Sequence, residues 1–247
     1  MINEPKIILA SSSPRRRLLL RQIGLDFEVI PADIGEEIGP DDTPADAVEA
    51  LSLQKAELIS GHPEVAQSDG NLLVIGADTI VVRDGKILGK PEDAAHAAAM
   101  LRSLSGRTHQ VYTGVALVYR ITSSQADEQK SGDRSNSPSD AFRQAGSHQD
   151  TVASLKQKGF LLHSFHERTD VTFGSLSDEE IAAYVNGGSP MDKAGAYGIQ
   201  DDLGALFVER ISGDYYNVVG FPLFRFYREV NNFFPGIVTA FESVQNT

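Results

Sequence analysis

The sequence contains no cysteine among its 247 residues. This absence excludes disulfide bonds, thiolate metal sites and a cysteine nucleophile, and it is typical of a protein from a reducing compartment. No apolar run approaches the roughly 20 residues that a membrane helix needs. The short apolar segment at residues 6–10 has neither the length nor the flanks of a signal peptide. We therefore expect a cytoplasmic protein that works away from membranes.

Positive charge is also scarce. The chain has 22 lysines and arginines against 34 aspartates and glutamates, a net charge of −12. The summed field repels phosphate at long range, so no nucleic-acid polymer is expected as a partner. A small phosphorylated ligand remains compatible with this charge if basic groups cluster locally or a metal ion intervenes. Each cluster of arginine and lysine in this acidic chain therefore needs an explanation.

One segment has few large apolar residues. Residues 122–158 are rich in serine, aspartate and glutamine. Such a segment cannot bury enough apolar surface to offset the entropy of ordering it. We expect a mobile insertion between two strands of a single domain that spans residues 1–247.

The rest of the chain alternates between predicted strands and predicted helices. The longest apolar stretch, residues 72–82, is rich in β-branched residues and is expected to break at Gly76–Asp78, and Asp84-Gly85 predicts a hairpin. The alternation is typical of a three-layer α/β protein, and the hairpin signals favour a mixed, twisted sheet flanked by helices. The predicted strands are 6–10, 27–31, 72–82, 86–88, 108–121, 165–173 and 205–211, and the predicted helices are 14–23, 44–60, 92–104, 178–185 and 222–234.

Residues 11–17, Ser-Ser-Ser-Pro-Arg-Arg-Arg, lie between the first predicted strand and the first predicted helix. Backbone N–H groups and the helix dipole favour an anion at this place, and serine and arginine side chains add donors for phosphate oxygens. Three arginines near a helix N-terminus oppose the dipole, which favours a bound anion. The alternative is a capped helix with solvated arginines. The pattern is not a P-loop, because GxxxxGK[ST] is absent.

A lone aspartate and an adjacent pair of glutamates are candidates for a metal or catalytic site. Asp78 follows a buried strand, where an unpaired carboxylate is costly. It is either a structural aspartate in a turn or a group directed at a metal or a water, and Gly76 and Ala77 leave room for a ligand to approach. Glu36 and the adjacent Glu37 form an acidic loop or add ligands for Mg²⁺ or Mn²⁺.

Two further segments carry groups that suit a nucleotide. Lys90 follows the predicted hairpin and could reach a phosphate, although lone lysines are usually solvated. In residues 192–200, DKAGAYGIQ, the small residues permit close approach of a flat ligand, and Gln200 offers an amide for a base edge. The alternative is a flexible loop. The six histidines show no HxxxH or HExxH spacing, so no zinc site is expected.

Taken together and in this order, these segments resemble the Maf family of nucleotide pyrophosphatases. The resemblance implies an α/β fold like that of the inosine-triphosphate pyrophosphatases, with a nucleotide cleft between two lobes. It implies Mg²⁺- or Mn²⁺-dependent hydrolysis of a nucleoside triphosphate to the monophosphate and pyrophosphate, which clears or sanitises nucleotide pools, and often a homodimer. The matching segments are LASSSPRRRLLL, VIGADTIVV, LGKPEDAAHAAAMLRSLSG, HQVYTGVAL, DVTF, DKAGAYGIQ and VVGFPL.

Three of these segments bear on the substrate. SPRR, GADT and GAYGIQ look like the branch that prefers dTTP and UTP, whereas SPWR, GSDQ and a GSFK-like segment are typical of the branch for methylated nucleotides. Two alternatives remain at this point. One is a non-catalytic nucleotide-binding regulator of cell division, and the other is a pyrophosphatase that acts on modified purine nucleotides.

The resemblance also implies a role for individual residues. Asp78 matches the catalytic acidic residue, and Asp78 with Glu36 matches the metal site, with Glu37 as the fallback. Lys90 matches a catalytic lysine near the phosphates. The implied substrate-binding residues are Ser11, Arg15, Arg16, Thr79, Lys193 and Gln200.

Arg16, Thr79 and Gln200 match positions that are tied to base preference in the dTTP/UTP branch. The sequence departs from the family pattern in the insertion at 122–158 and at Asp201-Asp202, where a glycine-containing turn is more usual. The second departure bears on the detail of the base pocket.

Overall fold

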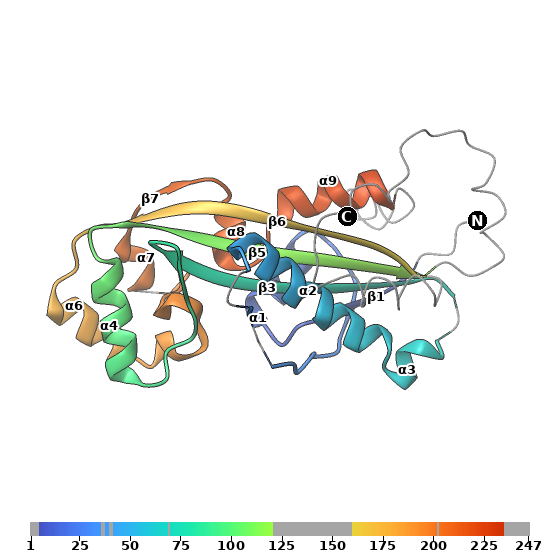
Figure 1. Cartoon of the computed structure of the whole chain (residues 1–247), viewed down its shortest axis with the longest axis horizontal. Coiled ribbons are helices and arrows are strands. Elements are labelled where there is room, and N and C mark those ends of the chain that lie inside the picture. The colour runs from blue at the N-terminus through green and yellow to red at the C-terminus, as the bar shows by residue number, and fades with distance from the viewer. Residues whose placement is uncertain are drawn as a thin grey trace.

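The computed structural model describes residues 5–35, 38–39, 42–68, 70–120, 160–201 and 203–234. Within these residues, one mixed sheet of seven strands extends along the long axis of the molecule, and helices cover both of its faces (Figure 1). The predicted α/β class, with a mixed sheet flanked by helices, is confirmed. In the described part of the chain, no helix is long and apolar enough to cross a membrane.

The sheet combines parallel and antiparallel pairing. β1 pairs in parallel with β2 and β3, while β3, β5, β6 and β7 pair antiparallel in that order, and the short β4 forms a hairpin with β3. The strands are β1 (Lys6–Ala10), β2 (Glu28–Val29), β3 (Leu72–Arg83), β4 (Lys86–Leu88), β5 (Thr108–Arg120), β6 (Phe160–Phe173) and β7 (Val208–Ser212). The helices are α1 (Pro14–Gln22), α2 (Pro44–Ser60), α3 (Pro63–Ala66), α4 (Ala94–Leu104), α6 (Asp178–Asn186), the 3-10 turns η3 (Ser189–Asp192) and η4 (Ala194–Ala196), α7 (Gly204–Phe207), α8 (Tyr215–Val219) and α9 (Leu223–Phe233).

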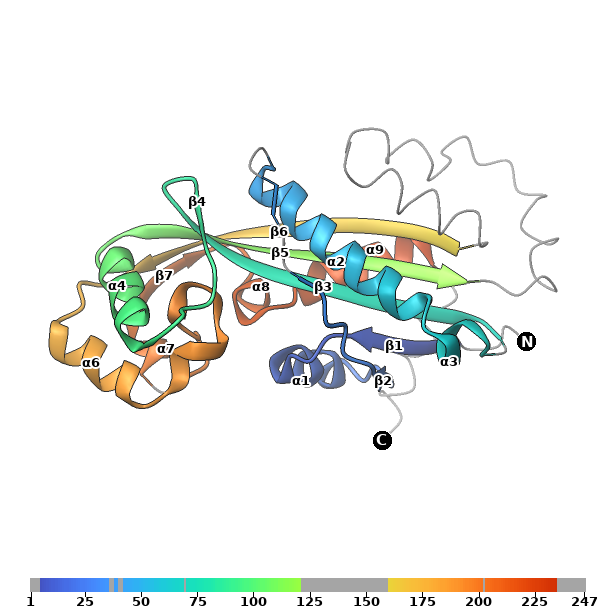
Figure 2. The same ribbon diagram turned by 60° about the horizontal axis from the view of Figure 1, so that its bottom comes forward.

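One face of the sheet is covered by α2, which crosses β3 and β5 (Figure 2). Two glycines allow the helix backbone to lie directly on the strands. A Cβ at Gly76 would lie 2.0 Å from the carbonyl oxygen of Ser52, and a Cβ at Gly114 would lie 2.1 Å from that of Val48. Gly76 therefore makes room for α2, and the prediction that it makes room for a ligand is wrong.

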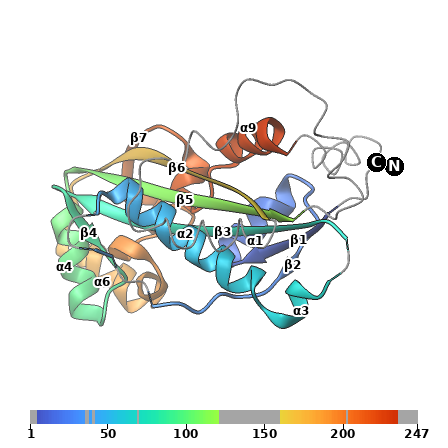
Figure 3. The same cartoon turned by 45° about the vertical axis from the view of Figure 1, so that its right-hand side comes forward.

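The opposite face of the sheet is covered in two parts. Near β1, the helices α1, α8 and α9 pack a core around Leu20, Phe221 and Phe226. Towards the other end, α4, α6 and the residues after α6 form a second core around Leu101 and Phe173. Figure 3 shows α4 and α6 at the end of the sheet remote from α3. Residues of both cores, among them Val219 and Tyr197, line the pocket described below.

Several predicted boundaries differ from the structure. β3 continues through Asp78 without a break, because β5 pairs with it in one register from Leu72 to Val82. Residues 204–207 form the helical turn α7 in place of a strand. The hairpin is confirmed, and both Asp84 (φ 50°) and Gly85 (φ 75°) adopt the left-handed conformation that such a turn requires.

The predicted insertion, residues 122–158, lies outside the described residues. β5 ends at Arg120, β6 begins at Phe160, and these two residues are partners in the antiparallel pairing of the two strands. The mobility of the intervening segment and its place in a single domain stay predictions.

Candidate functional site

The pocket lies where the edge of β3 is open. β1 pairs with β3 only as far as Gly76, and β4 pairs with it only from Val81. Between these two points, residues 77–80 pair with β5 on one side, and no described strand pairs with them on the other. A pocket of about 660 Å³ opens here, lined by the loop before α1, this stretch of β3 and residues 192–200.

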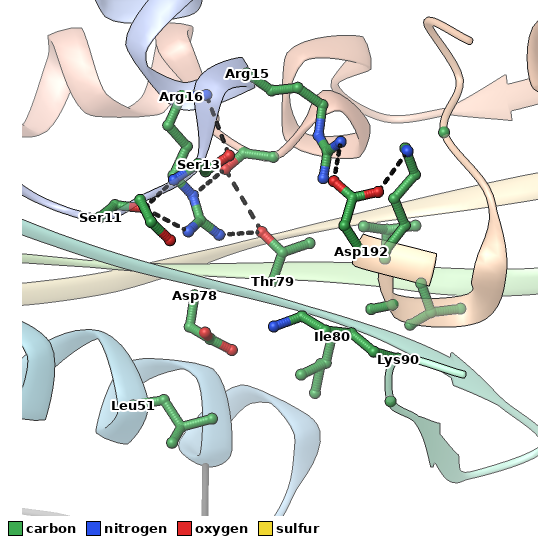
Figure 4. Close-up of a pocket in the computed structure, with 18 of the residues that line it drawn as sticks. Ser11, Ser13, Arg15, Arg16, Leu51, Asp78, Thr79, Ile80, Lys90 and Asp192 are labelled. Carbon is green, nitrogen blue, oxygen red and sulfur yellow. Dashed lines mark hydrogen bonds and ion pairs between the residues drawn. The ribbon is translucent and has the colours of Figure 1, made fainter. Parts of the chain in front are cut away.

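Asp78 lies on the α2 side of this open edge (Figure 4). Its carboxylate is buried, and Lys55 of α2 donates a hydrogen bond from Nζ to Oδ1. Lys55 and Asp78 are 23 residues apart in the sequence. The close approach of α2 over Gly76 brings Lys55 within reach of the Asp78 carboxylate. A buried aspartate is stabilised when a cation pairs with it. The turn expected at Asp78 is absent, since this residue lies within β3.

Lys55 is a pocket residue that the sequence prediction missed. Its side chain is only 10 % exposed, although it lies in a helix whose other buried positions are mostly small or apolar. The signal available in the sequence was a lysine on the apolar side of the predicted helix 44–60, between Leu51 and Ile59. Pattern alone does not distinguish such a lysine from one whose stem lies along apolar surface while its charge reaches water.

Arg16, in the first turn of α1, is held by several hydrogen bonds. Ser13 caps the helix by accepting a hydrogen bond from the backbone N–H of Arg16. The guanidinium is buried and donates from Nη1 to Ser11 Oγ (3.1 Å), from Nε to the Gly220 carbonyl (2.9 Å) and from Nη2 to Thr79 Oγ1 (2.8 Å). The alternative of solvated arginines is therefore wrong for Arg16.

Thr79 lies on the opposite face of β3 from Asp78, because successive strand residues alternate between faces. Its hydroxyl lies on the side of α1 and α8 and is 2.9 Å from the hydroxyl of Thr113, the residue directly opposite on β5. Figure 4 shows Asp78 and Thr79 on the two sides of the same strand. Both residues line the pocket, because the edge of the strand is open between them.

A chain of ion pairs crosses the mouth of the pocket. Arg15 Nη1 lies 3.3 Å from Asp192 Oδ2, and Lys193 Nζ lies 2.6 Å from Asp192 Oδ1 and 3.1 Å from Asp201 Oδ2. Burial raises the pKa of the Asp192 carboxyl, but hydrogen bonds and charge from Lys193 and Arg15 outweigh burial and leave that pKa below its ordinary value. Asp201, where the sequence departs from the family pattern, also accepts a hydrogen bond from the Tyr184 hydroxyl at 2.9 Å and so helps to hold Lys193.

The glycines of residues 192–200 serve contacts within the protein. Gly195 has φ 69°, and a Cβ there would lie 3.0 Å from the side chain of Val81. A Cβ at Gly198 would lie 2.8 Å from Cε of Lys193. Packing within the protein is therefore enough to account for glycine at positions 195 and 198, without a flat ligand. The segment is not a simple flexible loop either, since Tyr197 and Ile199 are buried.

His109, which holds residues 192–200 through Tyr197, is a second residue that the sequence prediction missed. His109 is fully buried, and its Nε2 lies 2.8 Å from the Tyr197 hydroxyl. Burial lowers the pKa of His109 to about 4, although the charge of Asp170 acts in the opposite direction. The imidazole is therefore neutral near pH 7, and it holds Tyr197 as an uncharged partner.

A model of the family described as Maf-like protein matches residues 6–138 and 143–233. The chain belongs to the Maf family. A dTTP/UTP pyrophosphatase of Bacillus cytotoxicus is 44 % identical over 231 residues, which cover 94 % of this chain and 97 % of that protein. A dTTP/UTP pyrophosphatase of Bacillus mycoides is 43 % identical over 228 residues, which cover 92 % and 95 % of the two chains.

Among the solved structures that match, one is only distantly similar in sequence. It is a nucleoside-triphosphatase, also described as a dITP/XTP pyrophosphatase, of Mycobacterium abscessus, with 13 % identity and a TM-score of 0.36 over 91 % of this chain and 92 % of that one. At that TM-score the match says nothing about activity.

In this Maf-family chain, the pocket brings together all but one of the predicted site residues. Lys90 is exposed and extends from the end of β4 across Ile80 towards Asp78 (Figure 4). Gln200 is exposed and also lines the pocket. Glu36, the predicted metal ligand, lies outside the described residues, as does its fallback Glu37. The predicted site residues that line the pocket are Ser11, Arg15, Arg16, Asp78, Thr79, Lys90, Lys193 and Gln200.

Proposed function

We propose that this protein hydrolyses nucleoside triphosphates to the monophosphate and pyrophosphate, with dTTP and UTP as preferred substrates. The relatives named dTTP/UTP pyrophosphatase match nearly the whole chain, which supports the same reaction here. The observation that carries the proposal is the composition of the pocket. It joins a buried carboxylate, Asp78, to a loop of serine and arginine donors at the start of α1.

Different residues of the pocket act on the attacking water, the phosphate oxygens and the leaving group. A water oxygen bonds to the α-phosphorus, and the bond from that phosphorus to the α–β bridging oxygen breaks. Asp78 accepts the proton of the water. Ser11 and the N–H groups at the start of α1 bind phosphate oxygens, and Arg15, Lys90 and Lys193 stabilise the charge on the departing pyrophosphate. No covalent nucleophile is required.

A divalent cation fits these residues. Mg²⁺ is usually bound through one or two carboxylates together with substrate phosphates, and not by a complete set of protein ligands. Among the described residues no group of three or more acidic or histidine side chains could hold a metal, yet Asp78 and Asp33 line the same pocket as the anion-binding loop. We assign Asp78, together with Glu36, to Mg²⁺ or Mn²⁺. When bound, the ion neutralises phosphate charge and lowers the pKa of a bound water.

Base preference belongs to the opposite face of β3. Thr79 and Arg16 supply a hydroxyl and a guanidinium on that side, and Gln200 adds an amide to the lining of the same pocket. Arg16 is already committed to three protein acceptors, so it fixes the position of Thr79 more than it offers itself to a ligand. The hydroxyl of Thr79 and the amide of Gln200 are therefore the groups that we assign to the pyrimidine.

The proposal extends to the cellular location and the oligomeric state of the enzyme. We expect a cytoplasmic enzyme, because the chain lacks cysteine, and a homodimer, as the resemblance to the family implies. Light scattering on the purified protein measures the mass in solution, and a mass of one chain would contradict the homodimer.

A substrate panel tests the proposed reaction. Pyrophosphate release is measured from dTTP, UTP, CTP, ITP and 7-methyl-GTP, with Mg²⁺, with Mn²⁺ and with EDTA. The expected result is release that is fastest from dTTP and UTP and is abolished by EDTA. Binding of UTP without release of pyrophosphate would indicate a non-catalytic regulator, and a preference for ITP or 7-methyl-GTP would indicate an enzyme of purine nucleotides.

A further inference from the structure

A buried polar network continues inward from Thr79. Thr113 on β5 is fully buried, and its Oγ1 lies 2.9 Å from Thr79 Oγ1 and 3.2 Å from the carbonyl oxygen of Asn217 in α8. Thr79 Oγ1 in turn accepts a hydrogen bond from Arg16 Nη2. Thr113 does not line the pocket, but its hydrogen-bond partner Thr79 does.

At the end of this network away from the pocket, the donors and acceptors around Asn217 can be assigned from the chemistry of their partners. Asn217 is fully buried, and its Nδ2 donates to the Val111 carbonyl (3.1 Å) and to Thr169 Oγ1 (3.0 Å). Because a backbone carbonyl can only accept, the contact with Val111 sets the orientation of the Asn217 amide. The hydroxyl of Thr169 donates to the Asp214 carbonyl at 3.0 Å. α8 is therefore held rigidly against β5 and β6, and the Asn217 carbonyl is an acceptor at a fixed position.

These contacts determine the direction of the hydrogen bonds. A hydroxyl has one proton to donate. The proton of Thr113 is used in the bond to the Asn217 carbonyl, which cannot donate, so the bond between the two threonines takes the proton of Thr79. The reverse direction would leave the contact between Thr113 and Asn217 without a proton. The second acceptor near the hydroxyl of Thr79, the Gly220 carbonyl at 3.5 Å, also lies in the protein. Thr79 therefore presents lone-pair density to the pocket and no proton.

We propose that Thr113 is a positioning residue for base selection, because it holds Thr79 as an acceptor. This inference rests on the proposed function and on the assignment of Thr79 to the base. Uracil and thymine carry an N3–H donor on the edge where cytosine carries a bare N3 acceptor. An acceptor held in place accepts a hydrogen bond from the N3–H of uracil or thymine. With cytosine, the same acceptor faces the lone pair of N3 and no hydrogen bond forms. The network through Thr113 thus favours UTP and dTTP over CTP.

The test compares Thr113→Val with Thr113→Ser. Valine preserves the shape of the side chain but removes the acceptor, so the Thr79 hydroxyl is no longer held by Thr113 and can turn its proton either to the Gly220 carbonyl, 3.5 Å away, or to a ligand. Serine keeps the hydroxyl. In Thr113→Val, we expect the ratio of kcat/KM for UTP to kcat/KM for CTP to fall by about ten-fold, the size of one hydrogen bond. In Thr113→Ser, we expect the ratio to stay within about two-fold of the wild type.

A double-mutant cycle separates positioning from a general structural effect. When Thr79 is already replaced by valine, Thr113→Val should not change the UTP to CTP ratio further. An unchanged ratio in the folded single variant Thr113→Val, an equal loss on both substrates, or a full effect in the Thr79→Val background would each overturn the proposal. Should Thr113→Val not fold, Thr113→Ala is used with the same readout.

The wild-type protein distinguishes failure of this inference from failure of the proposed function. No pyrophosphate from UTP in the wild type would contradict the proposed function itself. Pyrophosphate from UTP and CTP at equal kcat/KM would leave the hydrolase intact and overturn the role of Thr113.

Discussion

Asp78 and Thr79 are adjacent in the sequence, but they lie in different environments. On the α2 face, Asp78 forms a charged pair with Lys55 under a helix that two glycines bring close to the sheet. On the other face, Thr79 lies in a network of hydroxyls and backbone carbonyls and accepts a hydrogen bond from the Arg16 guanidinium. Because the strand edge is open, residues from both environments line one pocket. The comparison supports the proposal that turnover depends on one face and recognition of the base on the other.

The largest effect is expected from breaking the α2 face at its carboxylate. Asp78→Asn keeps the size of the side chain but removes the charge and the proton acceptor. We expect kcat for pyrophosphate release from UTP to fall by about 10³-fold or more. Thermal unfolding of the variant, measured beside the wild type, checks that it is folded. A folded variant with wild-type kcat would remove Asp78 from the mechanism.

The packing of the α2 face gives the next prediction. In Gly76→Ala, the new methyl group would meet the Ser52 carbonyl at 2.0 Å, and backbone cannot move aside as a flexible side chain can. We expect the free energy of unfolding to fall by about 3 kcal/mol. Urea denaturation measures it, and Gly174→Ala, at a site with no atom within 4 Å of the new Cβ, is the control and should change little. Equal stability of the two variants would contradict the close contact of α2.

On the Thr79 face of the sheet, His109 makes the stability of the protein depend on pH. Burial lowers its pKa from 6.5 to about 4, so between these values the unfolded chain binds a proton that the folded protein does not. This contribution to stability is present above pH 6.5 and is lost as the pH falls towards 4. Between pH 7 and pH 5, we expect a loss of about 2 kcal/mol. His109→Gln, compared by urea denaturation at both pH values, should lack this part of the loss. The same loss in both proteins would assign it to other groups.

A smaller effect is expected when the cation on the Thr79 face is changed. Arg16→Lys keeps the charge, but one ammonium group cannot reproduce the planar fork that serves Ser11, Thr79 and Gly220. We expect kcat/KM for UTP to fall by about ten-fold, mainly through KM, because the pocket wall is loosened while Asp78 is untouched. Arg21→Lys, at an exposed position of α1, is the control. A loss confined to kcat would place Arg16 in the chemistry instead.

Much of the fold follows from local patterns. The helix at 44–60 and the strand at 6–10 were predicted to the residue, since a capping threonine, a proline at the first turn and a bounded apolar run mark their ends. The hairpin at Asp84-Gly85 likewise follows from the conformations that its turn requires. β3 was predicted to break at Gly76–Asp78, because small and charged residues within an apolar run look like a turn. The sequence alone does not show that β5 pairs through this stretch.

The site was predicted only where a residue has a chemical signature of its own. The arginine-serine loop and Asp78 stand out in an acidic chain. Lys55, Thr113 and Asn217 do not, because their importance comes from partners that are distant in the sequence. Thr113 and Asn217 are 104 residues apart, and Lys55 and Asp78 are 23 apart. Only the tertiary structure brings such pairs together.

The separation of turnover from recognition is tested most directly by binding of nucleotides to Asp78→Asn. Isothermal titration calorimetry with Mg²⁺ measures the Kd of this variant for UTP and for CTP. If the two faces of β3 act separately, the variant releases no pyrophosphate yet still binds UTP more tightly than CTP. Equal affinity for the two nucleotides, in a variant that remains folded, would contradict the separation.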